Sequence, residues 1–269
     1  MKIRLLVFNL IFSSFAWAGA DCIHCQSYLP LEESRPWPIE YIKVNKVQYE
    51  RNTHASFCTR PLEIIDTIVL HHSETPSTVS AEKINDYHLT RGTATDPWYM
   101  IGYSYVINSA YPGASLPKLK VTEGRPLEII GAHAGTNAFV PMSVEQKKIW
   151  DEKKVKCGKE GQEGEFDPSM VKDGKIKANV TTLGLVVIGN YAPFSKTNPD
   201  GYSRRNPRHP TKSTLDSVAR MSCQLQKKHP RIKNIKWHNY YHNTSCPGLL
   251  KNYIGRIKAL ARMYGCEFN

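Results

Sequence analysis

The residues best suited to chemistry lie near the end of the chain, where His238 and Cys246 stand eight residues apart in a polar segment. His71, directly after the apolar run of residues 64–70, offers a third donor. Imidazole and thiolate groups bind Zn²⁺ well, and a catalytic zinc site needs three protein ligands and one open position for water. We therefore predict that His71, His238 and Cys246 hold a zinc ion.

A second histidine, His242, competes with Cys246 as the partner of His238. Residues four apart share one face of a helix, so His238 and His242 would pair if this segment were helical. The run from Asn243 to Pro247 makes a poor helix, and this favours Cys246. Histidines are also common as ordinary surface or core residues, which is the alternative for each of these side chains.

The cysteine count supports a special role for one thiol. The chain has seven cysteines, and in an oxidising compartment six of them could form three disulfides. Cys246 would then be the thiol that remains for the metal. Cys22 and Cys25 could instead be half of a zinc site or a redox pair, but no second Cys-x-x-Cys and no thioredoxin-like unit follows them.

Blocks of residues in a fixed order extend this pattern. They are Ile68-Val69-Leu70-His71-His72-Ser73, residues 101–107, residues 123–125 with 131–134, residues 183–185 with 189–191, and His238 with residues 244–248. Over about residues 60–265 the chain resembles the type-2 N-acetylmuramoyl-L-alanine amidases. That family includes phage amidases, bacterial cell-wall amidases and animal peptidoglycan recognition proteins.

The resemblance implies a zinc-dependent hydrolysis of the amide bond between N-acetylmuramic acid and L-alanine in peptidoglycan. It implies His71, His238 and Cys246 as zinc ligands, with His72 as a neighbouring or packing residue. Bound zinc would lower the pKa of a water molecule toward about 7. Tyr103 falls on the family's catalytic tyrosine, which would orient the water or pass a proton to the leaving nitrogen.

Four further positions follow from the same resemblance. The hydroxyl of Thr244 would stabilise charge on the scissile carbonyl oxygen, and His133 and Asn137 would contact substrate. Val186 stands where one subgroup has a glutamate base, so the chain resembles the tyrosine-using branch. Ordinary structural roles are the alternative: an aromatic residue on a strand for Tyr103, a turn or cap for Thr244, and a core histidine for His133.

Two other functions compete with the amidase. A receptor could bind peptidoglycan fragments without cutting them, but receptors of this family typically lack a zinc ligand, most often the cysteine. An amidase could also be deployed as an effector against other bacteria. The chain departs from its relatives at Met100, where an aspartate is frequent, and at Asn239-Tyr240, where Arg-Asp is frequent.

The elements that must position these residues suggest an α/β fold, with a central, mostly β sheet flanked by helices. We expect strands at residues 64–70, 101–107 and 183–189, the last in the centre of the sheet because it is apolar on both faces. Residues 127–134 read as a short extended segment. We expect helices from Ser80 through Ile84 and His88, over residues 214–228, and over residues 249–264.

The ends and the middle of the chain suggest three parts. Residues 1–18 have the basic start, apolar run and small-residue exit of a signal peptide, with an uncleaved anchor as the alternative. Residues 19–60 form a cysteine-containing extension, and residues 61–269 the zinc amidase domain. A charged insertion at about 138–182, helical at 145–151 and anchored by Cys157, reads as a surface loop.

The charge of the chain favours an anionic partner. Removal of residues 1–18 lowers the formal charge from +12 to +10, and a basic exported protein concentrates on anionic surfaces such as cell envelopes. We expect a periplasmic or secreted protein that binds peptidoglycan or muropeptide and is not inserted in a membrane after signal cleavage. No nucleic-acid motif occurs. Solubility is the alternative role for the charge, and no feature predicts an oligomeric state.

Overall fold

The computed structural model describes residues 42–93, 97–108, 120–192 and 208–269, all within one unit, Pro36–Asn269. The expected signal peptide, with Cys22 and Cys25 of the extension, lies outside these residues. In the part of the chain that is described, no helix is both long and apolar enough to cross a membrane.

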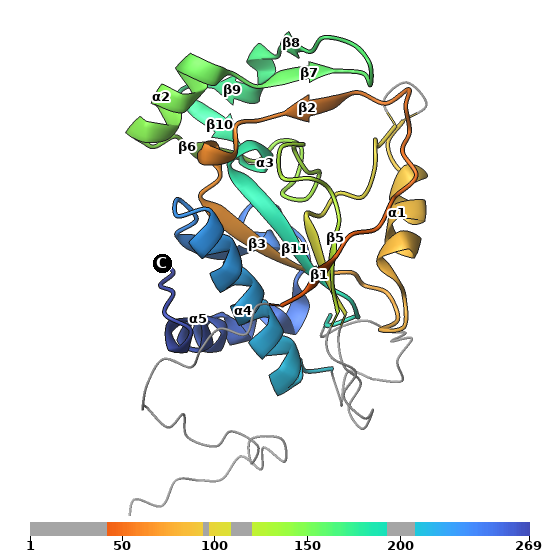
Figure 1. Ribbon diagram of the computed structural model, residues 1–269, viewed down its shortest axis with the longest axis vertical. Coiled ribbons are helices and arrows are strands. Elements are labelled where there is room, and N and C mark those ends of the chain that lie inside the picture. The colour runs from red at the N-terminus through yellow and green to blue at the C-terminus, as the bar shows by residue number, and fades with distance from the viewer. Residues whose placement is uncertain (1–41, 94–96, 109–119, 193–207) are drawn as a thin grey trace, which may run out of the picture. The chain divides into compact units, whose positions relative to one another are not determined.

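A six-stranded mixed sheet forms the centre of this unit (Figure 1). Its strands, from one edge to the other, are β1 (Val44–Asn45), β5 (Val121–Glu123), β4 (Tyr105–Ile107), β11 (Thr182–Val187), β3 (Thr67–His72) and β12 (Asn234–Trp237). Only β4 and β5 pair antiparallel. All six residues of β3 and of β11 are buried, which confirms the prediction of an apolar central strand.

Helices cover this sheet, which confirms the predicted α/β class. In α1 (Ala81–Leu89) the side chain of the N-cap Ser80 accepts a hydrogen bond from the amide of Lys83, as predicted. Ala81 and Ile84 of α1 belong to the same buried hydrophobic cluster as Val186 of β11. The helices α4 (Lys212–Lys228) and α5 (Ile254–Met263) pack against each other and contact β4 and β12, away from α1 (Figure 1).

Two strands, β3 and β4, begin later than predicted because backbone groups of the preceding residues form other hydrogen bonds. The apolar residue Ile64 lies in a 3-10 turn, η2 (Leu62–Ile64), so β3 begins only at Thr67. Residues 101–104 precede β4, and polar side chains of α1 take the amides of the first two of them. Asn85 Oδ1 accepts from Ile101 N at 2.8 Å, and His88 Nδ1 accepts from Gly102 N at 3.0 Å.

Other segments differ in kind from the prediction. Residues 127–134 do not form a strand, and their one β-bridge joins Ile129 to Thr59. The helix expected at 249–264 begins as a 3-10 helix, η5 (Gly248–Tyr253), before α5. The short strands β5 and β12 were not predicted. β12 has only four residues, and its place in the sheet depends on pairing with β3, far away in sequence.

The charged segment 138–182 is more regular than the surface loop that was predicted. It contains α2 (Val144–Lys153), which confirms the helix expected there, and α3 (Ala178–Thr181). Five of its strands lie in two small sheets. One consists of β6 (Phe139–Pro141), β10 (Lys175–Lys177) and β9 (Val171–Lys172), and the other of β2 (Phe57–Thr59), β7 (Lys156–Gly158) and β8 (Glu165–Phe166).

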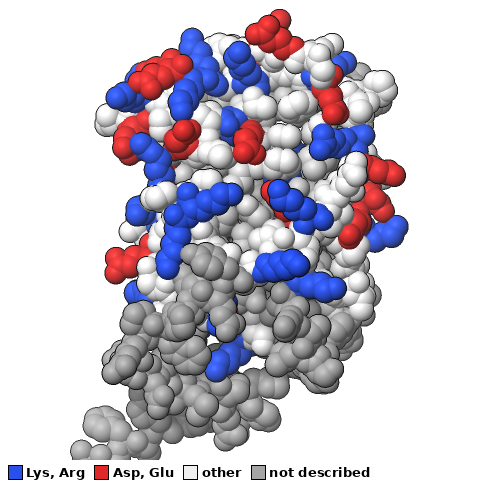
Figure 2. Space-filling model, viewed as in Figure 1, with Lys and Arg blue, Asp and Glu red and all other residues white. Residues whose placement is uncertain are grey.

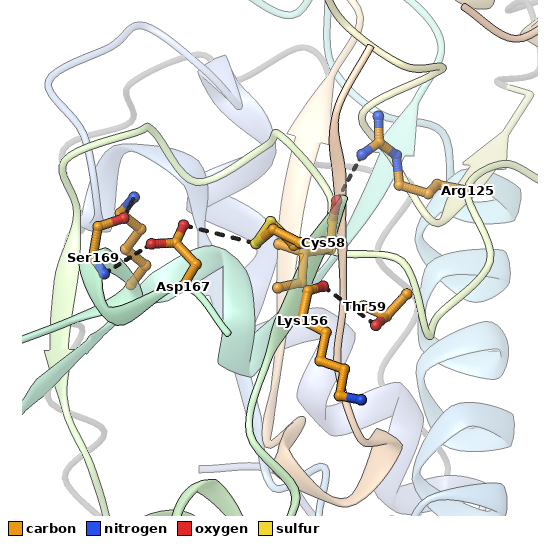
Figure 3. Close-up of a disulfide and its surroundings, with 9 residues drawn as sticks. Cys58, Thr59, Arg125, Lys156, Asp167 and Ser169 are labelled. Carbon is orange, nitrogen blue, oxygen red and sulfur yellow. Dashed lines mark hydrogen bonds between the residues drawn. A yellow bond between two sulfur atoms is a disulfide. The ribbon is translucent and has the colours of Figure 1, made fainter. Parts of the chain in front are cut away.

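Two disulfides tie distant elements together. Cys58 of β2 is bonded to Cys157 of β7, which confirms that Cys157 anchors the charged segment (Figure 3). Asp167 points at this disulfide, with Oδ2 3.7 Å from Cys157 Sγ. Cys223 of α4 is bonded to Cys266, beyond the end of α5. The proposed third disulfide would involve cysteines outside the described residues.

The positive charge is spread widely over the face that Figure 2 shows. Figure 2 shows Lys and Arg side chains across the described part of one face, with Asp and Glu side chains among them. Several exposed lysines pair with acids one helical turn away, such as Lys83 with Asp86 and Lys147 with Asp151. Such exposed pairs add little stability, and a spread of charge attracts anionic surfaces without defining one binding groove.

The disulfide Cys58–Cys157 should matter for stability because it closes a loop with a sequence separation of 99. Replacing both cysteines by serine should lower the free energy of unfolding by about 4 kcal/mol, since the unfolded chain regains that conformational freedom. Denaturant unfolding under oxidising conditions measures the change. A loss below about 1 kcal/mol would contradict the anchoring role of this bond.

Candidate metal centre

The pairing of β12 with β3 brings His71 and His238 together. Trp237 lies opposite Leu70 in this parallel pair. The next residue along each strand, His238 after Trp237 and His71 after Leu70, therefore lies at the carboxyl-terminal end of the pair. The two imidazole rings have centroids 4.6 Å apart. His238 opens the 3-10 helix η4 (His238–Tyr240), which turns the chain away from the sheet directly after this residue.

Cys246 completes the set from the loop that follows η4. Its Sγ lies 3.6 Å from His71 Nδ1 and accepts a hydrogen bond from the amide of His72 at 3.4 Å. The amide of Asn239 donates to the carbonyl of Cys246 and so closes this loop. One donor atom from each of His71, His238 and Cys246 lies within 4.8 Å of the other two, so the three predicted ligands converge.

The chemistry of these donors fits a metal ion. His238 Nε2 is buried and has no hydrogen-bond partner among the described residues, a state that costs about 1–3 kcal/mol unless another group meets it. Cys246 is buried and stands outside both described disulfides. Two imidazoles and one thiolate, with a position left open, are a donor set typical of catalytic zinc.

Burial sets the protonation of the donors. It lowers the pKa of His71 well below the usual 6.5 and, with His242 and His72 nearby, lowers the pKa of His238 to about 4. Both imidazoles are therefore neutral at pH 7 and keep a lone pair for a metal. Burial raises the pKa of the Cys246 thiol to about 12, so a metal ion must displace its proton on binding.

A cavity of about 260 Å³ opens onto these donors. Its lining includes Lys83, Tyr87 and His88 of α1, together with Glu74 and Thr244. A larger cavity, of about 490 Å³, lies beside α4 and the β1–β5 edge, with Lys46, Lys227 and Lys228 in its lining. The smaller cavity is the candidate active site, because His238 and Cys246 also line it.

The two residues predicted to act on substrate lie in this cavity. The ring of Tyr103 lies beside those of His71 and His88, with centroid distances of 5.0 and 5.4 Å. Burial raises the pKa of the Tyr103 phenol above its usual value, so it stays protonated and can donate. Thr244 Oγ1 accepts a hydrogen bond from the amide of Cys246 at 3.3 Å, which leaves its own hydrogen for a group in the cavity.

The two residues predicted to contact substrate do not line this cavity. His133 is 3% exposed and lies behind His71, with its Nδ1 3.2 Å from His71 Nε2. Burial lowers the pKa of His133 to about 3. Asn137 is exposed in the turn before β6.

Glu74 lines the cavity and was not identified from the sequence. It has a positive φ of 55°, a conformation that is rare outside glycine. Its Oε1 accepts from Ser245 Oγ at 2.8 Å and lies 3.2 Å from His72 Nε2. The close approach of His72 is the main reason why the pKa of Glu74 falls to about 2. Glu74 therefore joins the end of β3 to the loop that carries Cys246.

His88 is a second cavity residue that the sequence did not identify. It was expected only as a residue of the helix that begins at Ser80. Its Nδ1 accepts the amide of Gly102, so the other nitrogen carries the hydrogen, and burial lowers its pKa to about 4. One signal in the sequence could have pointed to His88. Two polar residues, Asn85 and His88, share the buried face of α1 with Ala81 and Ile84.

Comparison with known families gives one match. The model of the N-acetylmuramoyl-L-alanine amidase family matches residues 60–249. No curated protein matches the chain.

Solved structures that resemble this fold include amidases and peptidoglycan recognition proteins (PGRPs). The endolysin N-acetylmuramoyl-L-alanine amidase LysCS from Clostridium intestinale URNW is 18% identical with a TM-score of 0.47, over 82% of this chain and 96% of that one. Bumblebee PGRP-SA is 15% identical with a TM-score of 0.47, over 80% and 94%. Drosophila PGRP-LB is 18% identical with a TM-score of 0.40, over 80% and 82%.

The buried imidazoles predict how the stability of the metal-free protein depends on pH. The pKa values of His88, His133 and His238 lie below the usual 6.5, so the unfolded chain takes up protons first as the pH falls. The free energy of unfolding should therefore decrease from pH 6.5 toward pH 4, by up to about 1.4 kcal/mol per pH unit for each imidazole. Denaturant unfolding at several pH values in the presence of a chelator measures this slope.

The exposed histidine His54 provides a matched control, since His54→Gln should keep the slope. His88→Gln should reduce it. A free energy of unfolding that stays constant from pH 7 to about pH 4.5 would contradict the burial of neutral imidazoles.

Proposed function

The chain belongs to the N-acetylmuramoyl-L-alanine amidase family, and on this basis we propose that it hydrolyses the amide bond between N-acetylmuramic acid and L-alanine in peptidoglycan. The observation that carries the proposal is the convergence of donor atoms from His71, His238 and Cys246 beside a cavity that His238 and Cys246 line. These residues would hold a zinc ion. When bound there, zinc supplies a Lewis acid and a water molecule of lowered pKa.

Two side chains in the cavity would act on the scissile amide. The Thr244 hydroxyl, with its oxygen fixed by the amide of Cys246, would donate to the carbonyl oxygen as negative charge develops there. The Tyr103 phenol, which burial keeps protonated, would donate a proton to the nitrogen of the leaving L-alanine, and the phenolate would regain its proton from the water that attacks the carbonyl. Val186 stands where one subgroup of the family has a glutamate base, and it is a fully buried apolar residue. Tyr103 is therefore the proton-transferring group.

The other walls of the cavity would bind the substrate on either side of this bond. His88 presents an N–H, because its Nδ1 is occupied by the amide of Gly102. Glu74 presents a carboxylate whose low pKa keeps it charged at pH 7. Together they offer one donor and one acceptor to the polar groups of a muropeptide.

We propose in addition that the protein is exported, to the periplasm or the cell exterior. Residues 1–18 would be a signal peptide, residues 19–60 an extension, and residues 61–269 the amidase domain with its charged insertion at about 138–182. The two described disulfides support this location, because disulfides persist in oxidising compartments. The positive charge suits an anionic cell envelope.

Digestion of purified peptidoglycan tests the proposed reaction directly. The protein should release stem peptides that begin with a free L-alanine amine, as detected by mass spectrometry. A chelator or Cys246→Ala should abolish this release, since either removes the metal. Binding of peptidoglycan without cleavage in the presence of zinc would contradict the proposal and indicate a receptor.

The role of Tyr103 is tested separately. Tyr103→Phe removes only the phenol oxygen, so it should keep zinc bound and lower kcat by about 10² or more. Tyr87 lines the same cavity and is 58% exposed, so Tyr87→Phe is a matched control that should retain turnover. Unchanged turnover of Tyr103→Phe, measured on a synthetic muropeptide, would rule out proton transfer by this residue.

A further inference from the structure

Both ring nitrogens of His71 face a specific partner. Its Nδ1 lies 3.6 Å from Cys246 Sγ, on the side of the proposed zinc site. Its Nε2 lies 3.2 Å from Nδ1 of His133, and the two rings meet nearly at right angles, at 87°. His71 is fully buried and His133 is 3% exposed, so water does not compete for this bond.

Two glycines make room for the ring of His133. A Cβ on Gly184, in the middle of β11, would lie 2.9 Å from His133 Cγ. A Cβ on Gly131 would lie 2.8 Å from His133 Cδ2. A glycine weakens the interior of a strand, and it often marks a site where another group approaches closely. The central strand therefore carries a glycine at the point where His133 must approach His71.

The far side of the His133 ring determines which nitrogen carries its hydrogen. His133 Nε2 lies 3.4 Å from the carbonyl oxygen and 3.3 Å from Oγ1 of Thr182. That hydroxyl already donates its hydrogen to the carbonyl of Ala178 at 2.7 Å, so it can only accept from His133. Both neighbours of Nε2 are thus acceptors. The hydrogen of neutral His133 is on Nε2, and its Nδ1 is an acceptor.

Further bonds hold this arrangement in place. The Thr182 carbonyl also accepts from Nη1 of the buried Arg60 at 2.6 Å. The side-chain oxygen of Asn179 accepts from the amides of both His133 and Ala134, at 3.1 and 2.7 Å. The backbone and the ring of His133 are therefore both fixed.

From this geometry we propose that His133 is a positioning residue that fixes the tautomer and orientation of His71. Because His133 Nδ1 is an acceptor, His71 must carry its hydrogen on Nε2, and its Nδ1 lone pair is directed at the metal site. A hydrogen bond to the nitrogen that does not bind the metal raises the basicity of a histidine ligand and orders its ring. This inference rests on the proposed zinc site, not on the amidase reaction.

Two substitutions separate the hydrogen bond from packing. In His133→Asn the side-chain oxygen can take the place of Nδ1 as acceptor, whereas His133→Leu fills space without an acceptor. We expect His133→Leu to bind zinc about 10–100-fold more weakly than the wild type, and His133→Asn to stay within about threefold of it. Competition with a coloured zinc chelator measures affinity, and thermal unfolding of the metal-free forms checks that each variant folds.

A second pair of variants tests the space for the ring. Gly184→Ala should displace His133 and weaken zinc binding as His133→Leu does. Gly255→Ala, on α5 with nothing within 4 Å of the added Cβ, should leave zinc affinity unchanged. Long-range ¹H–¹⁵N correlation spectra of the zinc-loaded wild type should show His71 with its hydrogen on Nε2.

The outcomes are distinct. Wild-type affinity in His133→Leu, an equal loss in His133→Asn and His133→Leu, or a hydrogen on Nδ1 of His71 would each overturn the role of His133. A wild-type protein that binds no zinc would overturn both this role and the proposed metal centre. Zinc binding that follows the expected order in a protein without amidase activity would support the role of His133 and contradict only the proposed reaction.

Discussion

The site depends on the parallel pairing of β3 with its two neighbours. β12 pairs Trp237 with Leu70, and this register alone places His238 beside His71. β11 pairs Val186 with His71, so the alternate residue Gly184 lies on the same face, where it leaves room for His133. A shift of either neighbour by one residue would turn these side chains to the other face.

Burial makes this site costly to fold and suited to a metal. Neutral imidazoles and a protonated thiol lie where charge is poorly solvated, and His238 Nε2 has no partner among the described residues. A divalent cation would satisfy this nitrogen and bind the thiolate, so metal binding and folding should be coupled. Burial also keeps the Tyr103 phenol protonated. Exclusion of water therefore sets the protonation state of both the imidazole ligands and the proton donor.

Much of the fold and the ligand set could be predicted from the sequence, because local patterns carry them. The apolar segment 183–189 marks the centre of the sheet, and Ser80 marks the start of α1. The ligands His71, His238 and Cys246 were predicted from donor chemistry and the order of motifs, and the structure brings them together. The family is also as expected.

The rest depends on contacts between residues far apart in sequence. Residues 101 and 102 read as strand, but Asn85 and His88 take their amides. In the charged segment 138–182, β7 and β8 form a sheet only with β2, which the disulfide Cys58–Cys157 bonds to β7, while β6, β9 and β10 pair with one another. Glu74 lines the cavity with its backbone in a left-handed conformation. His88 lines it from the buried face of α1, where it lies among apolar residues. His133 was expected to contact substrate, but its place behind His71 follows from Gly184, 51 residues later.

X-ray absorption at the zinc K-edge, on the protein loaded with one equivalent of zinc, tests the metal centre most directly. The proposed site predicts one sulfur at about 2.3 Å and two imidazole nitrogens at about 2.0 Å, with one further light atom from water. A first shell without sulfur, or with two or more sulfurs, would contradict a centre built from His71, His238 and Cys246.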